Sequence, residues 1–583
     1  MASTETVAEA AVGFTPEQKE YLAGFLAGAA RLASVSPIDA VAPAPAGNSA
    51  VREEMIHGTP VGDATKQERW KHEEHPLDGW DRILAHAEAS KLPDEEHTFR
   101  FRNFGLFFVG PTQNSLMLRC RIPAGELSSA QLIGLADMAD EFGNWKIAIT
   151  TRANIQIREI APRNMVNVLT RLQSLGLTAR GSGVDNIRNI TASPTAGFDP
   201  QELIDTRPFA HALHHYILNH REFYNLPRKF NVAFEGGGSV DTAANTNDIG
   251  FMAVSVGDGA ERGVQFRVEL CGITGHKQLA RDCGILVKPS EAVAVAAAMI
   301  RVFIENGNRT DRKKARLKYL VDRWGVERFL GETQKKLSFP LVRFPLEKCV
   351  PRKPPLPHGH IGVYRQKQKG RNYIGAVIPV GVVTSRQVRR IAELAANYGS
   401  SQVRLTPWQN LLIPDVADGF VETVKRQLVR AGLHHAANSI VGGLVACTGN
   451  SGCKFAASDT KGHALEAGQF LSRRVQIDHP VNIHFTGCPN SCAQHYIGDI
   501  GLQGVKVNSG GSSVEGYNIV LGGGCGIDAA IGKDVFKGIA FSEVPALLER
   551  ILKVYQARRE PNESFVAFVR RHELRQLQEM FSE

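Results

Sequence analysis

Hydrophobic positions follow the same pattern in two stretches of the chain that lie 256 residues apart. Residues 122–177 align with residues 378–433 without a gap, so that Asn154 falls on Asn410. In each copy an extended apolar stretch meets a Pro/Gly turn, and a helix, two strands and a second helix follow. The predicted strands are 116–122, 146–150 and 155–157, then 373–378, 402–406 and 411–413, and the last helices end at Gly176 and Gly432.

This β-α-β-β-α order predicts an α+β fold that contains a duplicated half-domain. Two halves related by a pseudo-two-fold axis are expected to pack together, and binding sites often form at such interfaces. An arm precedes the first copy. Its sequence predicts a helix from Thr15 to about Leu32, a linker over 36–50 and a helix at Leu77–Ala89.

Composition narrows the class of protein. Of the 583 residues 43% are apolar and 22% are charged, which is typical of a globular chain of two to four domains. The chain has no apolar run of about 18 residues, so no membrane span is expected. Met1–Glu20 lacks the apolar core of a secretory signal. Nine cysteines are too few for a disulfide scaffold, and we expect a cytoplasmic protein.

Four cysteines stand in two close pairs. Cys447 and Cys453 are spaced C-x5-C, and Cys488 and Cys492 are spaced C-x3-C; both pairs follow short apolar strands. Thiolates on such loops suit zinc or an iron–sulfur cluster, although zinc ribbons normally use tighter knuckles. The other five cysteines, for which the sequence indicates only buried side chains, are Cys120, Cys271, Cys283, Cys349 and Cys525.

The text around these cysteines resembles a known family. CTGNSGC and TGCPNSC, followed by Asp499-Ile500-Gly501-Leu502, are similar to the ferredoxin-type sirohaem nitrite and sulfite reductases, as is the stretch 306–329. The resemblance runs from about Phe99 to Glu549. It implies sirohaem and a [4Fe–4S] cluster, held by Cys447, Cys453, Cys488 and Cys492. In that family the last thiolate also ligates the sirohaem iron, which implies this role for Cys492 and a cofactor contact for Asn490.

The resemblance also implies the architecture, a three-domain reductase fold with duplicated ferredoxin-like halves and two α/β lobes. The expected segments are an N-terminal arm and linker (1–98), the first half (99–178), the first sirohaem-binding lobe (179–345), the second half (346–433) and the cluster- and sirohaem-binding lobe (434–583).

Basic residues are expected to line the site, because sirohaem carries eight carboxylates and the substrate is an anion. The resemblance implies that Arg119, Arg188 and Lys229 are active-site cations. It implies cofactor contacts for Arg152 and Gln156. Arg119 and Arg121 alternate along a predicted strand and should face one way. For Arg121 and Arg228 we expect a structural role or a salt bridge.

Asn231 bears on the substrate. Sulfite reductases of the family typically carry a Lys two places after the position of Lys229, whereas Asn231 resembles nitrite reductases. Sulfite carries up to two negative charges and nitrite one, so a further cation favours sulfite. We therefore predict six-electron reduction of nitrite to ammonium by a ferredoxin–nitrite reductase type of oxidoreductase, with assimilatory sulfite reduction as the alternative.

No flavin or nicotinamide module is visible, so electrons are expected from another protein, a ferredoxin or similar acidic one-electron donor. A candidate docking surface is 348–371, with seven Lys/Arg and no acid, or else this segment is a solvated linker. Two glycine-rich loops, 236–238 and 522–526, are predicted to be either backbone cradles for the cofactor or plain turns. We attribute the net charge of +9 to a pocket that binds the anionic cofactor and to a surface that faces the acidic donor. No nucleic acid or membrane partner is expected. We expect a monomer.

Three other classes remain open at this stage: a related cobalamin-pathway oxygenase that shares the cluster motif in a shorter chain, a nucleic-acid-binding protein with a structural zinc, and a non-catalytic electron carrier. The electron-carrier class is disfavoured, because a carrier does not need anion-binding cations.

Overall fold

The duplicated segments fold into two five-stranded sheets that share strands. The structure is a computed structural model, and it describes residues 54–109 and 114–582. The predicted arm helix at 15–32 and the linker at 36–50 lie outside the described residues. The first sheet has the order β17-β6-β7-β4-β3 and the second β15-β16-β19-β18-β5. Their bounds are β3 (Leu106–Phe108), β4 (Leu116–Arg119), β5 (Glu126–Ser128), β6 (Lys146–Ile149), β7 (Ile155–Ile160), β15 (Gly362–Arg365), β16 (Arg371–Ala376), β17 (Val382–Thr384), β18 (Gln402–Leu405) and β19 (Leu411–Ala417).

Each half contributes one short strand to the sheet of the other. Strand β17, from the second copy, pairs with β6, and β5, from the first copy, pairs with β18. The predicted strands and helices of both copies are confirmed, with helices α7 (Ser129–Phe142), α8 (Met165–Ser174), α13 (Ser385–Tyr398) and α14 (Val421–Arg430). The exchange of strands was not predicted, because local hydrophobic periodicity does not contain the pairing partner.

The two long helices begin with the same cap. Ser128 accepts a hydrogen bond from the Gln131 amide and Gln131 reaches back to Ser128; Thr384 and Gln387 do the same for α13. This capping box satisfies donors that the first turn of a helix leaves free. The exchanged strands β5 and β17 end at these caps, so the repeat includes the strand-to-helix junction.

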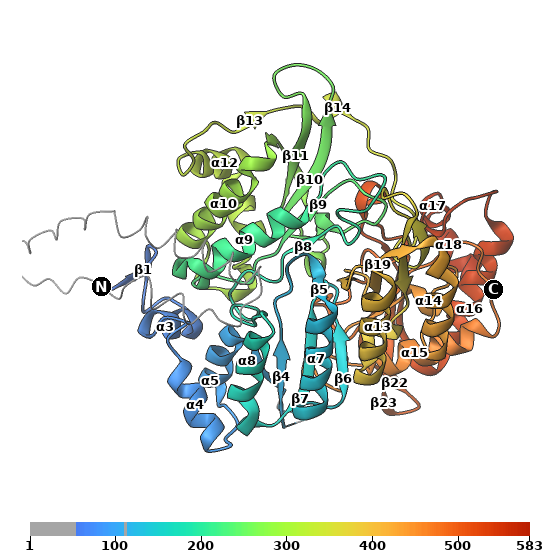
Figure 1. The fold of residues 1–583 in the computed structure, drawn as a ribbon, viewed down its shortest axis with the longest axis horizontal. Helices are drawn as coiled ribbons and strands as arrows, with labels where there is room; N and C mark the ends of the chain where they lie inside the picture. The colour runs from blue at the N-terminus through green and yellow to red at the C-terminus, as the bar shows by residue number, and fades with distance from the viewer. Residues whose placement is uncertain (1–53, 110–113, 583) are drawn as a thin grey trace, which may run out of the picture. The chain divides into compact units, whose positions relative to one another are not determined.

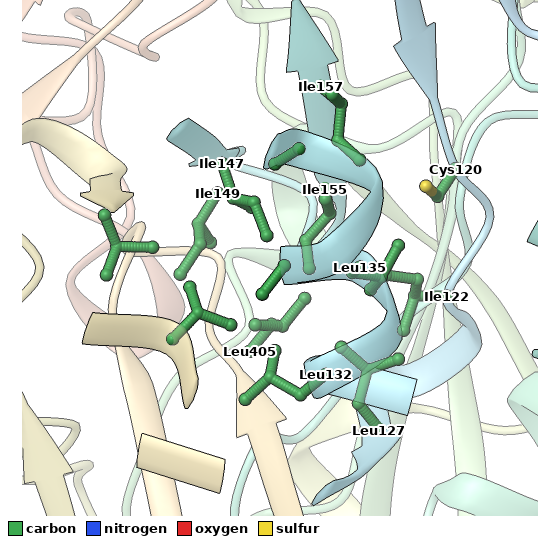
Figure 2. Close-up of a cluster of buried hydrophobic side chains, with 14 of the residues drawn as sticks. Cys120, Ile122, Leu127, Leu132, Leu135, Ile147, Ile149, Ile155, Ile157 and Leu405 are labelled. Carbon is green, nitrogen blue, oxygen red and sulfur yellow. The ribbon is translucent and has the colours of Figure 1, made fainter. Parts of the chain in front are cut away.

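The two halves share one hydrophobic core. Helices α7 and α13 pack against each other (Figure 1), and the buried residues of both copies form a continuous cluster. Leu405 of the second half lies among Leu132, Ile147 and Ile149 of the first (Figure 2). Because burial of apolar side chains is the main stabilising term in folding, the halves are expected to fold as one body.

Two further sheets carry the remaining elements. In each, three parallel strands continue into an antiparallel hairpin. The third sheet consists of β8 (Thr191–Ala192), β9 (Val232–Glu235), β10 (Ile249–Val256), β11 (Gly263–Leu270), β12 (Arg281–Val287), β13 (Val342–Arg343) and β14 (Cys349–Val350). The fourth consists of β20 (Leu444–Ala446), β21 (Ile483–Thr486), β22 (Ile500–Ser509), β23 (Ser512–Leu521) and β24 (Lys533–Ala540).

Helices cover these sheets and form separate cores with them. Those of the third sheet are α9 (Arg207–Asn219), α10 (Ala292–Asn306), α11 (Leu317–Trp324) and α12 (Val326–Gln334). Those of the fourth are α15 (Thr460–Ser472), α16 (Val544–Arg558), α17 (Phe565–Arg570) and α18 (Leu574–Ser582). The mixture of helices with parallel and antiparallel strands, and the duplicated half-domain, confirm the α+β class.

The segment before the first half is folded from Met55 onward. It contains the hairpin β1 (Met55–Ile56) and β2 (Thr59–Pro60), and the helices α3 (Lys66–Glu73), α4 (Trp80–Glu88) and α5 (Glu95–Phe101). Helix α4 confirms the helix expected at Leu77–Ala89. Residues 55–583 form one compact unit, and the finer boundaries expected at 98, 178, 345 and 433 stay a prediction. Within the described residues no helix has both the length and the apolar character to cross a membrane.

Candidate active site

The loops that carry the four paired cysteines leave the same edge of the fourth sheet. Strands β20 and β21 are parallel neighbours, with Ala446 beside Phe485. Cys447 follows β20 directly and Cys488 lies just after β21. Parallel strands end at a common edge, which is where ligands bind in sheets of this type. The strand order therefore brings together two cysteine pairs that are far apart in the sequence.

Hydrogen bonds already reach two of the sulfurs. The Gly487 amide donates to Cys447 Sγ at 3.2 Å, and Asn490 Nδ2 donates to Cys488 Sγ at 3.4 Å. Donors of this kind stabilise thiolates and tune the clusters that they hold. Gly487 is required here, because a Cβ at this position would lie 2.5 Å from the Cβ of Ala456.

Cys492 differs from the other three thiols in its exposure. Its side chain is exposed, whereas those of Cys447, Cys453 and Cys488 are buried or half-buried. The surface that Cys492 exposes faces an internal cavity. In the absence of a metal, burial and then the nearby Cys447 raise the pKa of Cys492 to about 11. A bound metal centre would reverse this, because metal coordination deprotonates a thiol.

The cavity has a volume of about 950 Å³ and unites the predicted site. Its wall combines the first half, the loops of the third sheet and the two cysteine loops. All eleven predicted site residues line it, namely Arg119, Arg152, Gln156, Arg188, Lys229, Asn231, Cys447, Cys453, Cys488, Asn490 and Cys492.

Four of the cations in this wall are not neutralised by carboxylates. Among the described residues, Arg119, Arg152, Arg188 and Lys229 form no ion pair with an acid. Burial lowers the pKa of Arg119 and of Arg152 to about 10; neighbouring arginines add to this effect, and the Cys492 sulfur opposes it. Burial and then Arg316 lower the pKa of Lys229 to about 7. Such crowding of positive charge is unfavourable unless an anion occupies the space between the cations.

Backbone and aromatic groups hold these cations in place. Arg119 ends β4 opposite Gln156 on β7, and its guanidinium carbon lies 4.2 Å from the centre of the Phe107 ring. Arg188 donates to the carbonyls of Ser182 and Val184 at 2.5 and 3.0 Å. These contacts leave the positive charges available to a ligand in the cavity.

Asn231 contacts a cation of the cavity directly. With its amide oriented to satisfy both of its atoms, the side-chain oxygen accepts a hydrogen bond from Arg152 Nη2 at 3.0 Å. The Asn231 backbone amide donates to Asp248, whose carboxylate pairs with Arg316 at 2.7 Å. The residue is buried, so a side chain of different charge at this position would change the electrostatics of the whole wall.

Sequence comparison identifies this arrangement. The family described as "Nitrite and sulphite reductase 4Fe-4S domain" matches residues 183–341 and 438–583, and "Nitrite/Sulfite reductase ferredoxin-like half domain" matches 110–175 and 364–431. The chain belongs to the nitrite and sulphite reductase family.

Curated members of the family are similar along most of the chain. The ferredoxin–nitrite reductase of Synechococcus elongatus is 37% identical over 80% of this chain and 90% of its own length. The chloroplastic ferredoxin–nitrite reductase of Zea mays is 33% identical over 78% of this chain and 81% of its own length. Among solved structures, the NirA protein of Mycobacterium tuberculosis superposes with a TM-score of 0.82 at 30% identity, covering 88% of this chain and 97% of that protein.

Membership of the nitrite and sulphite reductase family implies a [4Fe–4S] cluster and sirohaem, and the cavity fits both. Four thiols on adjoining loops match a cluster, and unpaired cations match a cofactor that carries many carboxylates. Two guanidinium nitrogens of residues that line the cavity, Arg102 Nε and Arg158 Nη1, are buried without a partner among the described residues. Within the described residues no group of three or more His, Cys, Asp or Glu is placed to hold a single metal ion.

Several residues of the wall were not predicted. They include Arg158 on β7, Lys461 in α15, Arg312, Arg316 and Arg102. Arg158 could have been found from the sequence, because it lies two residues after Gln156 on the same strand and therefore on the same face. Arg312 and Arg316 belong to the family-like stretch 306–329. Arg102 carries no such signal, because it belongs to none of the motifs named above although it lies within the resemblance that begins at about Phe99.

The expectation that Arg121 faces the same way as Arg119 is wrong. Strand β4 ends at Arg119, and the Arg121 guanidinium turns into the protein, where it donates to the carbonyls of Gly181 and Ile187 at 3.2 and 2.7 Å. Arg121 keeps a structural role but makes no salt bridge among the described residues. Arg228 does form the expected salt bridge, 3.6 Å from Asp185, and it also lines the cavity.

Three other segments do not line the cavity. They include the glycine loops at 236–238 and 522–526, and the choice between turns and cofactor cradles for these loops stays a prediction. The segment 348–371 does not line it either, and three of its cations are paired with acids: Arg352 with Glu235, Arg365 with Asp418 and Lys367 with Glu202. These pairs neutralise three of the seven cations, and the choice between a docking surface and a linker stays a prediction.

Proposed function

We propose that this protein reduces nitrite to ammonium with six electrons, using sirohaem coupled to a [4Fe–4S] cluster and a reduced ferredoxin as donor. The observation that carries the proposal is the convergence of four thiols and four unpaired cations on one cavity. The curated relatives named above are ferredoxin–nitrite reductases and are matched over most of their length.

The cysteines are assigned to the cofactors. Cys447, Cys453, Cys488 and Cys492 would hold the cluster, and Cys492 would also bind the sirohaem iron. The exposure of Cys492 to the cavity supports this second role, because its sulfur is the most open of the four. Arg152, Gln156 and Asn490 would contact the cofactors. When bound, these groups supply the iron that binds the anion and the route for single electrons.

The chain itself supplies charge and protons. Arg119, Arg188 and Lys229 would bind the oxygens of nitrite, since each is a cation of the wall that forms no ion pair with a carboxylate among the described residues. A pKa of about 7 enables Lys229 Nζ to donate a proton at neutral pH and to regain it between steps. Asn231 would leave the anion site with three cations rather than four, which suits the single negative charge of nitrite.

The decisive experiment is an assay with both anions. The purified holoprotein, supplied with a chemically reduced one-electron dye, should consume six electrons for each nitrite and release ammonium. Sulfite tested in parallel measures the alternative activity. A protein without sirohaem absorption bands, or one that releases no ammonium, would refute the proposal. Faster turnover of sulfite than of nitrite would establish the sulfite reductase alternative.

Two finer points are also proposed. We assign the protein to a reducing compartment, the cytoplasm, because all nine cysteines are free thiols in the structure. We expect the single chain to be the working unit, because the cavity wall and all eleven site residues come from one chain. Sedimentation analysis tests the second point, and a stable dimer would contradict it.

A further inference from the structure

The Arg158 guanidinium reaches from the first ferredoxin-like half to the loop that carries Cys447 and Cys453. Its Nη2 donates to Thr448 Oγ1 at 2.8 Å, and Thr448 directly follows Cys447. Its Nη1 lies 2.6 Å from the position that a Cβ of Gly452 would occupy, and Gly452 directly precedes Cys453. Arg158 therefore lies against the loop next to both cysteines.

A second hydrogen bond fixes the direction of the side chain. Arg158 Nη2 also donates to Gln156 Oε1 at 2.8 Å, from the same strand β7. Nη2 is thus fully engaged by two neutral oxygens. Nη1 is buried and has no hydrogen-bond partner, and Arg158 pairs with no carboxylate in the part of the chain that the structure describes. An amide side chain could satisfy the two oxygens, so the contacts alone do not explain an arginine.

The positive charge of Arg158 interacts electrostatically with the sulfurs of Cys453 and Cys447. Burial lowers the pKa of Arg158 to about 10, and the strongest opposing influences come from Cys453 and then Cys447. The guanidinium stays protonated at neutral pH, so a permanent positive charge lies beside two of the four thiols. Another cation near Cys447 is Lys461, whose Nζ donates to the carbonyls of Val380 and Ala446.

We propose that Arg158 sets the reduction potential of the cluster by holding an uncompensated positive charge beside Cys447 and Cys453. One-electron reduction adds one negative charge to the cluster, and a positive charge nearby in a weakly polar interior stabilises that state. The electron comes from the external one-electron donor, which is oxidised by one electron, and no bond forms or breaks. The inference rests on the proposed function only in placing a [4Fe–4S] cluster at the four cysteines.

The test compares Arg158→Gln and Arg158→Lys in the holoprotein. The midpoint potential of the cluster is measured by equilibrium redox titration with electron paramagnetic resonance, and iron and sirohaem contents are measured in the same samples. Arg158→Gln keeps hydrogen-bonding capacity but removes the charge. We expect the equilibrium constant for one-electron reduction to fall about tenfold, which corresponds to about 59 mV. Arg158→Lys should restore most of the wild-type potential.

The matched control is Arg163→Gln, an exposed arginine just after the same strand, which should leave the potential unchanged. If Arg158→Gln does not yield a folded protein, Thr448→Val releases one anchor of the guanidinium while keeping the charge, and the potential should fall by a smaller amount.

Three results would overturn the inference. The first is an unchanged cluster potential in Arg158→Gln, or in Thr448→Val if that variant replaces it, and the second is a potential in Arg158→Lys as low as in Arg158→Gln. The third is a loss of sirohaem with no change in potential, which would mean that Nη1 binds a cofactor carboxylate instead. A protein that contains no cluster would refute the proposed function, whereas a cluster with an unshifted potential would refute only this inference.

Discussion

Asp185 accepts two hydrogen bonds from the Arg312 guanidinium, at 2.7 and 2.8 Å, at the edge of the cavity. The same carboxylate lies 3.6 Å from Arg228 and 3.8 Å from Lys71, a residue of helix α3. Burial by itself would raise the pKa of Asp185, but Lys71 and Arg312 hold it below its usual value. One buried acid therefore orders two cations of the cavity wall and connects them to the N-terminal segment.

Replacement of Asp185 by Asn should destabilise the protein strongly. The change keeps the shape of the side chain but removes the counter-charge of the half-buried Arg228 and Arg312, and one of the two acids that pair with Lys71; removal of one partner from a buried pair costs about 3–5 kcal/mol. The free energy of unfolding measured by chemical denaturation checks this. The control is Asp78→Asn, which breaks an exposed pair with Arg221 and should cost no more than about 1 kcal/mol. Equal effects of the two substitutions would contradict the role of Asp185.

Arg119→Ala should impair catalysis without loss of the cofactors. Arg119 is held by the Phe107 ring and by no carboxylate among the described residues, so its charge is free to act on the anion. Removal of one such group from an electrostatic site lowers kcat about 100-fold. Steady-state kinetics with nitrite measure the change, and absorption spectra measure the sirohaem content. Arg163→Ala, on the surface, serves as the control, and full nitrite activity in Arg119→Ala would remove Arg119 from the mechanism.

Asn231→Lys should raise the ratio of sulfite to nitrite activity. The new ammonium group would lie beside Arg152 and add a fourth cation to the anion site, which favours the more highly charged anion. Asn231→Gln, which adds bulk without charge, separates the effect of charge from that of size. The ratio of the two kcat/KM values is the measurement. An unchanged ratio in Asn231→Lys would remove the physical ground for preferring nitrite.

His495 should make the protein less stable in acid. It is fully buried, and burial followed by His484 lowers its pKa to about 3. Because the folded-state pKa lies below the unfolded value of 6.5, the neutral imidazole contributes stability that is complete above about pH 6.5 and is lost as pH falls toward 3. The loss amounts to about 1.4 kcal/mol per pH unit.

Chemical denaturation of wild type and His495→Gln at several pH values isolates this contribution. Other buried groups titrate in both proteins, so the difference between them reports on His495. We expect wild type to lose stability relative to the variant as pH falls from 6.5 to 4. His434→Gln, at an exposed position, should run parallel to wild type. A difference that does not vary with pH would show that His495 is not held neutral.

The sequence by itself determined the secondary structure of both copies and the pairing of the cysteines into two loops, whereas the site cations were implied by the family resemblance. These features are local: helical and strand periodicity reflects which face of an element is buried, and Cys447 and Cys488 are recognisable from the turns that follow their strands. The resemblance of the cysteine loops to a family supplied the cofactors, and the family matches confirmed them.

Only the tertiary structure decided which of these residues meet. Exchange of β5 and β17 between the halves, the inward turn of Arg121 and the contact of Arg158 with Thr448 all depend on partners that are distant in the sequence. The same holds for Lys71, whose place beside Asp185 connects an N-terminal helix to the carboxylate that pairs with Arg228 and Arg312 of the cavity wall. The physical reason is that packing and charge balance act through space, so a local pattern specifies that a side chain is buried or charged but not what lies beside it.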